Sequence, residues 1–227
     1  MSLLGKAALA MWWDMAAEMR ADFENWHTHE HFPERLGIPG FRRATRWSDA
    51  AGGEGVFVMY ELDDHDVLAS PPYLARLNAP TPWSTKLMPH HRHMVRTQCR
   101  VLESAGGAVA RHALTVRLAP QAGQADALRS ALKAHVDALP TCPGLVGAHL
   151  LQHESPPIAT TTEQRIRGLL DQAADWVVVV CGYDLGALQE LTRGTFDDDA
   201  LRAAGAADGA LVGLYALSHS ATPADIG

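Results

Sequence analysis

Residues 38–44 read IPGFRRA and residues 142–148 read CPGLVGA, so the same Pro-Gly turn occurs twice in the chain. In both copies a large apolar residue follows the glycine, and an alanine stands three positions after it. The two prolines are 104 positions apart (143 − 39). At that offset LAMWWD (9–14) aligns with ALTVRL (113–118), and both stretches are predicted strands. The turn therefore marks an internal repeat.

The segment between each of these strands and its Pro-Gly turn has the apolar spacing of a helix. Farther along, VFVMYEL (56–62) matches VVVVCGY (177–183) at an offset of 121 (177 − 56), because a proline- and threonine-rich insertion occupies about residues 153–175. A second helical pattern and a closing strand, at 93–103 and 209–219, complete each copy. The apolar helix stripes are Met15, Met19, Phe23 and Trp26 in the first copy, and Ala125, Leu128, Leu132 and Val136 in the second.

The order strand, helix, strand, strand, helix, strand is that of a ferredoxin-like unit. We predict an α+β protein with one such unit in residues 1–104 and a second, carrying the insertion, in residues 105–227. Two helices would cover one face of each sheet, so the bare faces must be buried. Facing each other, the two antiparallel sheets would form a pseudo-dimeric, eight-stranded α/β barrel whose interior holds side chains or one small ligand. The alternative is two independent ferredoxin-like domains side by side.

Composition argues against several classes of partner. The 227 residues carry a formal net charge of −7, which disfavours a nucleic-acid partner held by counterion release. No stretch reaches the ~20 apolar residues that span a bilayer, and the first residues lack a signal-cleavage pattern. The three cysteines, Cys99, Cys142 and Cys181, are widely spaced, which suits a reducing compartment. We expect a cytoplasmic protein that binds a small molecule and neither nucleic acid nor membrane; homodimer formation stays open.

The stretch from Trp26 to Phe41 carries the pattern W-x-x-x-E-H-x-P-E-R-L-x-x-P-G-F. It resembles the segment after the first strand in EthD-like members of the dimeric α/β-barrel superfamily, and SPPYLARLNAPTPW (70–83) is similar to the same group. The resemblance covers most of residues 5–103 and implies a cavity more than a reaction. The superfamily includes cofactor-free monooxygenases, lactone isomerases and haem-binding enzymes. Most relatives build the barrel from two chains, whereas this sequence implies one.

The pattern contains a histidine-rich helix end. On a helix, His27, Glu30, His31 and Glu34 form one polar stripe, while His29 points away from it. Because Pro33 disfavours helical geometry at the preceding residue, we expect the stripe to run off the helix end. The stripe could bind a metal, supply a general base, or only cap the helix at the surface. His31 is favoured because it is the histidine of the EthD-like motif and because the repeat offset brings it to His135.

Aromatic residues concentrate in the first copy, so we place the ligand nearer its sheet. Strand alternation predicts that Met11, Trp13, Thr115 and Arg117 face the barrel interior. Arg96 and Arg100 share one face of a closing strand and suit either a ligand carboxylate or a charged sheet edge. His90, His91 and His93 are predicted to lie in a solvated connection. The remaining aromatic candidates for the cavity wall are Trp47, Tyr60 and Trp83.

We therefore expect a small-molecule enzyme of EthD-like type that acts on a small, partly apolar compound by oxygenation or proton transfer. His31 would act in acid–base chemistry and Glu34 would orient it. A non-catalytic ligand-binding or stress-related module and a haem protein are the alternatives. No cofactor fingerprint occurs, so none is expected, with haem and a divalent metal left open by the histidines. The predicted ligand contacts are Met11, Trp13, His27, Glu30, Trp47, Tyr60, Trp83, Arg96, Arg117 and His135.

Overall fold

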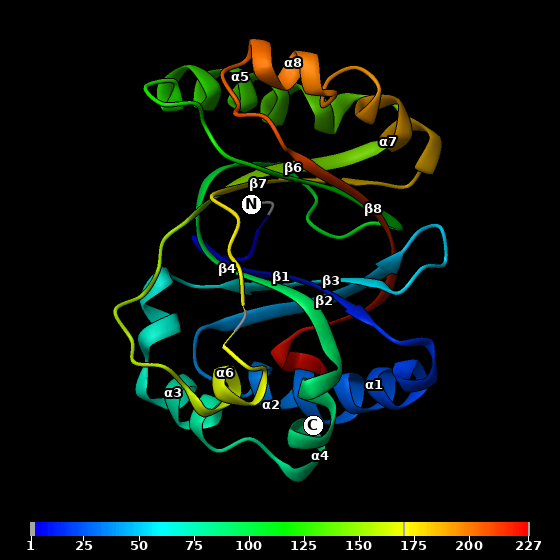
Figure 1. Ribbon diagram of the computed structural model, residues 1–227. Helices are drawn as coiled ribbons and strands as arrows, with labels where there is room; N and C mark the ends of the chain where they lie inside the picture. The colour runs from blue at the N-terminus through cyan, green and yellow to red at the C-terminus, as the bar shows by residue number, and fades with distance from the viewer. Residues whose placement is uncertain (1–2, 170, 227) are drawn as a thin grey trace.

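Eight strands close into one antiparallel barrel in the computed structural model, which describes residues 3–169 and 171–226. Around the barrel the order is β1-β3-β2-β8-β5-β7-β6-β4, so each half of the chain contributes four neighbouring strands. Helices cover the barrel in two layers, one on each side (Figure 1). This is the predicted pair of ferredoxin-like sheets facing each other. The strands are β1 (Ala7–Met15), β2 (Phe41–Asp49), β3 (Gly55–Leu62), β4 (His91–Gly106), β5 (His112–Leu118), β6 (Leu145–His153), β7 (Trp176–Gly182) and β8 (Leu211–Ala221).

The helical layers divide unequally between the two halves of the chain. One layer contains α1 to α4 of the first half together with the short α6 of the second half (Figure 1). The other layer contains α5, α7 and α8. The helices are α1 (Arg20–Trp26), α2 (Phe32–Leu36), α3 (Pro71–Asn78), α4 (Pro82–Leu87), α5 (Ala125–Ala138), α6 (Thr162–Ile166), α7 (Leu185–Thr192) and α8 (Asp198–Ala203). A π-helix, η2 (His27–His31), joins α1 to α2. Short 3-10 turns occur at η1 (Ala17–Met19), η3 (His65–Ala69), η4 (Met88–His90), η5 (Leu139–Thr141) and η6 (Pro223–Asp225).

Both Pro-Gly turns depend on the glycine. Gly40 has a φ of 95° and Gly144 a φ of 87°, values in the left-handed region that side chains with a Cβ rarely adopt. Each turn ends the first helical segment of its half and leads into the next strand, β2 or β6. The Pro-Gly dipeptide is therefore repeated because both turns need a glycine in the left-handed conformation.

The prediction that Met11 and Trp13 face the barrel interior is wrong. Strand β1 turns Trp12 inward, where its indole Nε1 donates to the Thr115 hydroxyl at 3.2 Å. The guanidinium of Arg117 lies 5.1 Å from the Trp12 ring centre, so Thr115 and Arg117 do face inward. The offset that fits the Pro-Gly turns is one residue out of step in the first strands, and a one-residue displacement exchanges the two faces of a strand.

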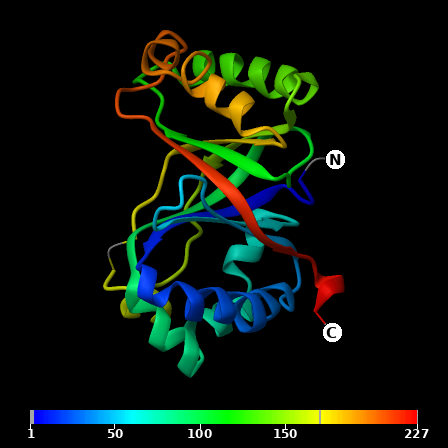
Figure 2. The same ribbon diagram turned by 90° about the vertical axis from the view of Figure 1, so that its right-hand side faces the viewer.

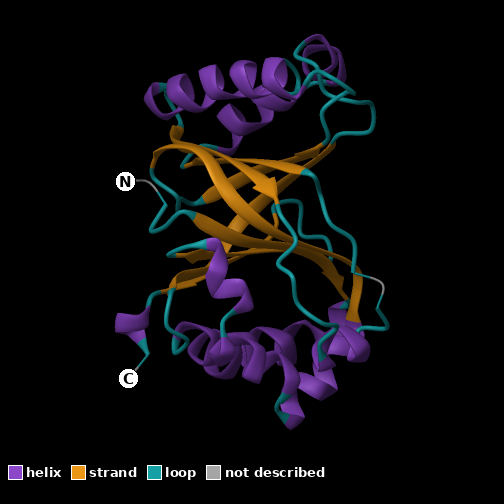
Figure 3. Cartoon of the chain, turned by 90° about the vertical axis from the view of Figure 1, so that its left-hand side faces the viewer, coloured by secondary structure: helices purple, strands orange, loops and turns teal. Residues whose placement is uncertain are grey.

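The insertion of the second half crosses to the helices of the first half. After β6 the chain crosses the outside of the barrel to the helical layer of the first half, shown at the bottom of Figure 1. There it forms α6 beside α3 and then returns to β7 (Figures 1 and 3). Thr161 and Gln164 form a reciprocal capping box at the start of α6. The side view shows β8 running diagonally from the upper layer to the C-terminal turn beside the lower layer (Figure 2). The second half therefore contributes to the covering of the first sheet.

Within the described part of the chain, no helix combines the length and the apolar character that crossing a membrane requires.

Candidate functional site

The helix that carries the motif histidines widens into a π-helix at His27–His31. Pro33 has no backbone N–H to offer the carbonyl four residues before it, and its ring crowds that carbonyl. The chain responds with a wider turn, in which the N–H of Phe32 donates to the carbonyl of His27. The expected helix end is therefore wrong: Phe32 keeps helical geometry and α2 continues to Leu36.

His27 and His31 lie side by side on the buried side of this π-helix. Their ring centres are 5.3 Å apart, and the planes of the two rings differ by 25°. The Trp26 ring lies 4.4 Å from His31 and the Phe32 ring 4.3 Å from His27. His29 is exposed, as its predicted position on the opposite side requires. The two histidines belong to the core between the helices and the sheet.

His91 joins them, against the prediction that it lies in a solvated connection. It begins β4, pairs with Met15 of β1, and its ring centre lies 4.9 Å from that of Trp13. Three histidines within four residues suggested a polar connection, and only the pairing of β4 with β1 turns His91 toward the helices. We call His27, His31 and His91 the histidine cluster.

Several polar atoms around the histidine cluster are buried without a hydrogen-bond partner among the described residues. Buried polar groups are normally paired, so such a concentration needs an explanation. The imidazoles and the Trp13 indole lie among aromatic rings, and the ring of Tyr60 lies 5.6 Å from that of Phe32, which packs on His27. Binding sites for small organic molecules combine aromatic walls with a few polar groups in this way. The atoms are Nδ1 of His27 and His31, both ring nitrogens of His91, Nε1 of Trp13, the Tyr60 hydroxyl and Oε1 of Glu34.

Burial keeps the histidine cluster uncharged. Desolvation lowers the pKa of His27 and of His31 well below the usual value, and it lowers the pKa of His91 to about 3. The nearby arginines Arg35 and Arg167 lower the pKa of His31 further. Desolvation also raises the pKa of Tyr60, which stays a phenol. The site therefore presents neutral imidazoles and neutral donors at physiological pH.

Glu34 lies beside His31 without holding it. Its Oε2 is 3.9 Å from Nδ1 of His31, too far for a hydrogen bond, whereas the same oxygen accepts from Nη1 of Arg35 at 3.0 Å. Desolvation raises the pKa of Glu34, although Arg35 and Arg76 oppose that shift. The predicted orienting bond is thus absent between these two side chains.

A buried ionic network connects the site to the insertion. Arg35 also donates to Glu163 of α6, and Arg167 lies 3.6 Å from the second oxygen of Glu163. Arg167 in turn donates to both oxygens of Asp171, at 2.6 to 3.2 Å. The insertion was predicted only as a proline- and threonine-rich segment, because nothing in its sequence indicates which helix it reaches. These ionic residues of the site were missed for that reason.

Met11 is less buried than its neighbours on β1. It lies on the helix-facing side of β1 and is only half-buried, while Leu9 and Trp13, its neighbours on the same face, are buried. Met11 pairs with Arg96 of β4, whose guanidinium donates to the Tyr73 hydroxyl at 2.8 Å. Met11, Trp13, Tyr60 and Arg96 therefore share the covered face of the first sheet with the histidine cluster.

The other predicted contacts lie elsewhere. Trp47 and Arg117 face the barrel interior, on the opposite side of the sheet, where Trp47 stacks 5.0 Å from Phe57. His135 lies on α5 in the other helical layer, 6.0 Å from Phe196, so its match to His31 in the repeat gives no shared site. Trp83 donates to Asp22 at 3.0 Å, and Glu30 accepts from Trp26 at 3.1 Å and from Thr81 at 2.5 Å. Trp83 and Glu30 thus hold helices together at the edge of the site.

The geometry supports neither of the two hypotheses left open by the sequence, a divalent metal ion or a haem. Across residues 3–169 and 171–226, no three His, Cys, Asp or Glu side chains are arranged to hold a metal ion. A haem would need a flat slot beside one imidazole, but the rings of Trp26, Phe32 and Trp13 pack within 5 Å of the three cluster histidines. The cluster as packed does not fit a porphyrin.

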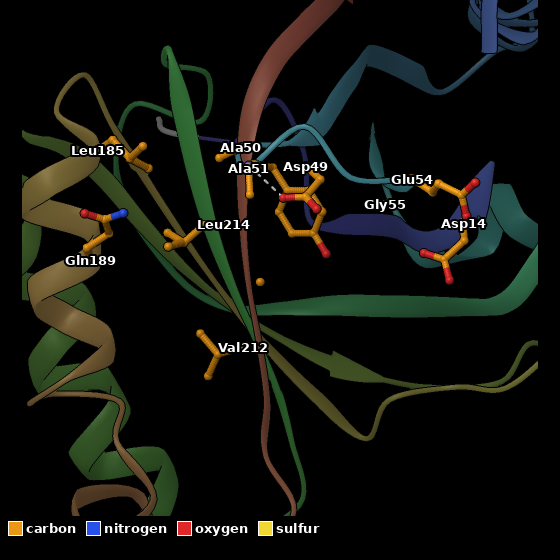
Figure 4. Close-up of a pocket in the computed structure, with 12 residues that line it drawn as sticks. Asp14, Asp49, Ala50, Ala51, Glu54, Gly55, Leu185, Gln189, Val212 and Leu214 are labelled. Carbon is orange, nitrogen blue, oxygen red and sulfur yellow. Dashed lines mark hydrogen bonds between the residues drawn. The ribbon is translucent and has the colours of Figure 1, made fainter. Parts of the chain in front are cut away.

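A separate cavity of about 590 Å³ opens at one end of the barrel. Figure 4 shows three carboxylates around it, those of Asp14, Asp49 and Glu54. Each has a partner: Asp14 contacts His93 at 2.8 Å, Asp49 accepts from the backbone of Ala51 at 2.9 Å, and Glu54 pairs with Arg92. Among the described residues that line it, none has a buried side-chain polar atom without a partner, in contrast to the histidine cluster.

Solved structures with a similar fold are known. An anthrone oxidase-like protein superimposes with a TM-score of 0.63 at 13% identity, covering 100% of this chain and 97% of its own. The chain shares with it the fold of an eight-stranded, pseudo-dimeric α/β barrel. A candidate monooxygenase from Fusobacterium nucleatum gives a TM-score of 0.62 at 8% identity, covering 97% and 96% of the two chains. A candidate chlorite dismutase gives 0.51 at 12% identity, covering 97% of both. At these identities the similarity concerns the barrel fold alone.

Comparison with protein-family models and with curated proteins gave no match.

Proposed function

We propose that this protein is a small-molecule enzyme of the monooxygenase-like, EthD-like type, with its active site at the histidine cluster. The observation that carries the proposal is the set of buried polar atoms without partners around His27, His31 and His91. A protein core without a ligand would be expected to pair or omit such groups, because each unpaired buried group costs roughly 1–3 kcal/mol. Several of them together suit a substrate better than a packing role.

The lining defines the substrate class. Trp13, Trp26 and Phe32 are flat and apolar, so the proposed substrate is a small aromatic or conjugated compound, which these rings admit by moving apart from the histidines. The indole N–H of Trp13 and the phenol of Tyr60 can donate hydrogen bonds to an oxygen of that compound. The neutral imidazoles can accept a proton from it. A compound with an acidic O–H or C–H group on a conjugated frame meets all three requirements.

The proposed step is a proton transfer to His31. Its neutral ring takes the proton, and the substrate becomes a delocalised anion stabilised by the Tyr60 and Trp13 donors. In the oxygenation branch a carbon of the anion bonds to O₂, the co-substrate and oxidant, and the resulting peroxide takes the proton back from His31 to give a hydroperoxide. In the isomerisation branch His31 returns the proton to another carbon of the anion. A lowered histidine pKa weakens the base but leaves it unprotonated, which the step requires.

The experiment compares His31→Ala with His29→Ala. Both histidines occupy the same π-helix, but His29 is exposed and serves as the matched control. Phenols, quinols and enolisable ketones are incubated with and without O₂, with products followed by NMR and O₂ consumption by electrode. We expect His31→Ala to lower kcat by about 10²-fold or more while His29→Ala stays near wild type. Equal rates in the two variants would refute the role of His31.

One observation favours a second candidate, a non-catalytic ligand-binding module. The Arg35–Glu163 pair and α6 close the site with buried contacts, which suits retention of a ligand. In that case the same panel would give saturable binding, seen as a change in tryptophan fluorescence, with no product. Binding without turnover across the whole panel would favour this module over the enzyme.

A further inference from the structure

Arg96 is a buried cation without a buried counter-charge. Its residue is 7% exposed, and it belongs to no ion pair within the described residues. Its guanidinium makes a single hydrogen bond in that part of the chain, to the Tyr73 hydroxyl at 2.8 Å. Arginine has five N–H donors and stays charged, and the other nitrogens of Arg96 are not among the buried atoms without partners, so they border open space.

Arg46 shows how the same fold satisfies a buried arginine that has no such function. It is 4% exposed and donates to three neutral acceptors: the Ser218 hydroxyl, the Glu24 carbonyl and the Thr28 hydroxyl, at 3.2 to 3.3 Å. It also lies 5.6 Å from the Phe23 ring centre. The contrast shows that the free donors of Arg96 face open space, where a ligand can replace water.

Arg96 faces a small polar cavity of about 160 Å³, formed where the insertion runs along β4. Beside it on the strand is Gln98, 8% exposed, whose side-chain amide has no hydrogen bond among residues 3–169 and 171–226. Gln164 of α6 also lines the cavity; it uses its Oε1 in the capping box, and its amide N–H group makes no hydrogen bond among the described residues. The other lining residues are His153, Ser155, Asp171, Gln172 and Ala173.

The lining is thus rich in hydrogen-bond donors around one positive charge. Asp171 is the exception, but its two oxygens accept from Arg167, so its charge is already matched there. Donors converging on a guanidinium match a planar carboxylate, which accepts two parallel N–H bonds. The volume admits a group of a few non-hydrogen atoms.

We propose that this cavity is a binding site for a carboxylate or similar small oxyanion, with Arg96 as its charge partner and Gln98 and Gln164 as further donors. The site is built by both halves of the chain, because β4 supplies Arg96 and the insertion supplies the opposite wall. It stands whether or not the histidine cluster is catalytic. The oxyanion has two sources, a free small anion or the carboxylate of a larger molecule that also reaches the histidine cluster past Met11.

The test measures binding of sodium acetate and sodium benzoate by calorimetry, with neutral benzamide as the control for shape. We expect saturable binding of both anions, with Kd on the order of 1 mM, and none of benzamide. Arg96→Gln should weaken both by about tenfold or more. Arg100→Gln is the matched control: it lies four residues along β4, is exposed and is paired with Glu154, so it should change Kd by less than about twofold.

If Arg96→Gln does not fold, Arg96→Lys serves as a second variant because it keeps the positive charge. Arg96→Lys should weaken binding less than Arg96→Gln. Imidazole NMR separates the two sources: benzoate but not acetate shifts the His27, His31 and His91 signals if the carboxylate belongs to a ligand of the histidine cluster. Unchanged histidine signals indicate a free oxyanion. Failure to saturate below about 20 mM, benzamide binding as well as benzoate, or an unchanged Kd in both Arg96 variants would overturn the proposal.

Discussion

The guanidinium of Arg35 donates to the carboxylate of Glu163, although the two residues are 128 positions apart in the chain. Arg35 lies on α2 of the first half and Glu163 on α6 of the insertion, and both side chains are at most 6% exposed. This single pair joins the motif helix of one half to the insertion of the other. It therefore links closure of the candidate site to the stability of the whole chain.

The first prediction concerns that pair. Arg35→Met or Glu163→Gln alone should lower the free energy of unfolding by about 3–5 kcal/mol, because each leaves a buried charge with fewer partners. The double variant should lose less than the sum of the two, which a double-mutant cycle in urea measures. Arg202→Ala, which breaks an exposed pair with Asp208 at 2.9 Å, should cost at most about 1 kcal/mol. Strict additivity of the two buried substitutions would contradict the coupling.

The second prediction concerns pH. The pKa of His91 is lowered in the folded state to about 3, whereas an unfolded histidine has an ordinary value near 6.5. Between these values the unfolded chain binds more protons, so stability rises with pH and is lost as pH falls below about 6.5. His91→Phe should remove up to about 1.4 kcal/mol per pH unit from that slope. Urea unfolding from pH 5 to 8 measures the difference, and equal slopes in the two proteins would count against a neutral buried His91.

The third prediction concerns the π-helix. Pro33→Ala restores a backbone N–H and removes the crowding that widens the turn, so an ordinary α-helix becomes available. The free energy of unfolding should change by less than about 1 kcal/mol, because the local strain and the lost packing oppose each other. His27 and His31 would rotate out of their present positions. NMR of the imidazoles should show this, and unchanged histidine signals would mean that Pro33 does not set the π-helix.

The fourth prediction concerns the barrel interior. Phe57 stacks between Trp12 and Trp47, each 5.0 Å from its ring centre. Phe57→Ala should cost about 3–5 kcal/mol and weaken the near-ultraviolet circular dichroism of the tryptophans. Leu211→Ala, on β8 and 55% exposed, should stay within about 0.5 kcal/mol of wild type. A small loss at Phe57 would show that the interior tolerates a cavity.

The order of strands and helices could be predicted from the sequence, because apolar periodicity and the two Pro-Gly turns are local properties of the chain. The bare sheet faces then required the barrel, since exposed apolar faces must be buried. His31 and Tyr60 were predicted as site residues from local motif and composition, and both side chains are buried. The side chains of β1 that point into the barrel were predicted wrongly, because a one-residue error in aligning the repeat exchanges the two faces of the strand.

The surroundings of the motif histidines could not be predicted in this way, because they depend on tertiary contacts. His91 and Arg96 reach the site because β4 pairs with β1, and Glu163 and Arg167 reach it because the insertion crosses to the helices of the other half. The register of β4 and the path of a long connection depend on contacts between distant residues, which no local pattern encodes. The fold therefore followed from periodicity, whereas the chemistry of the site followed from which distant side chains the barrel brings together.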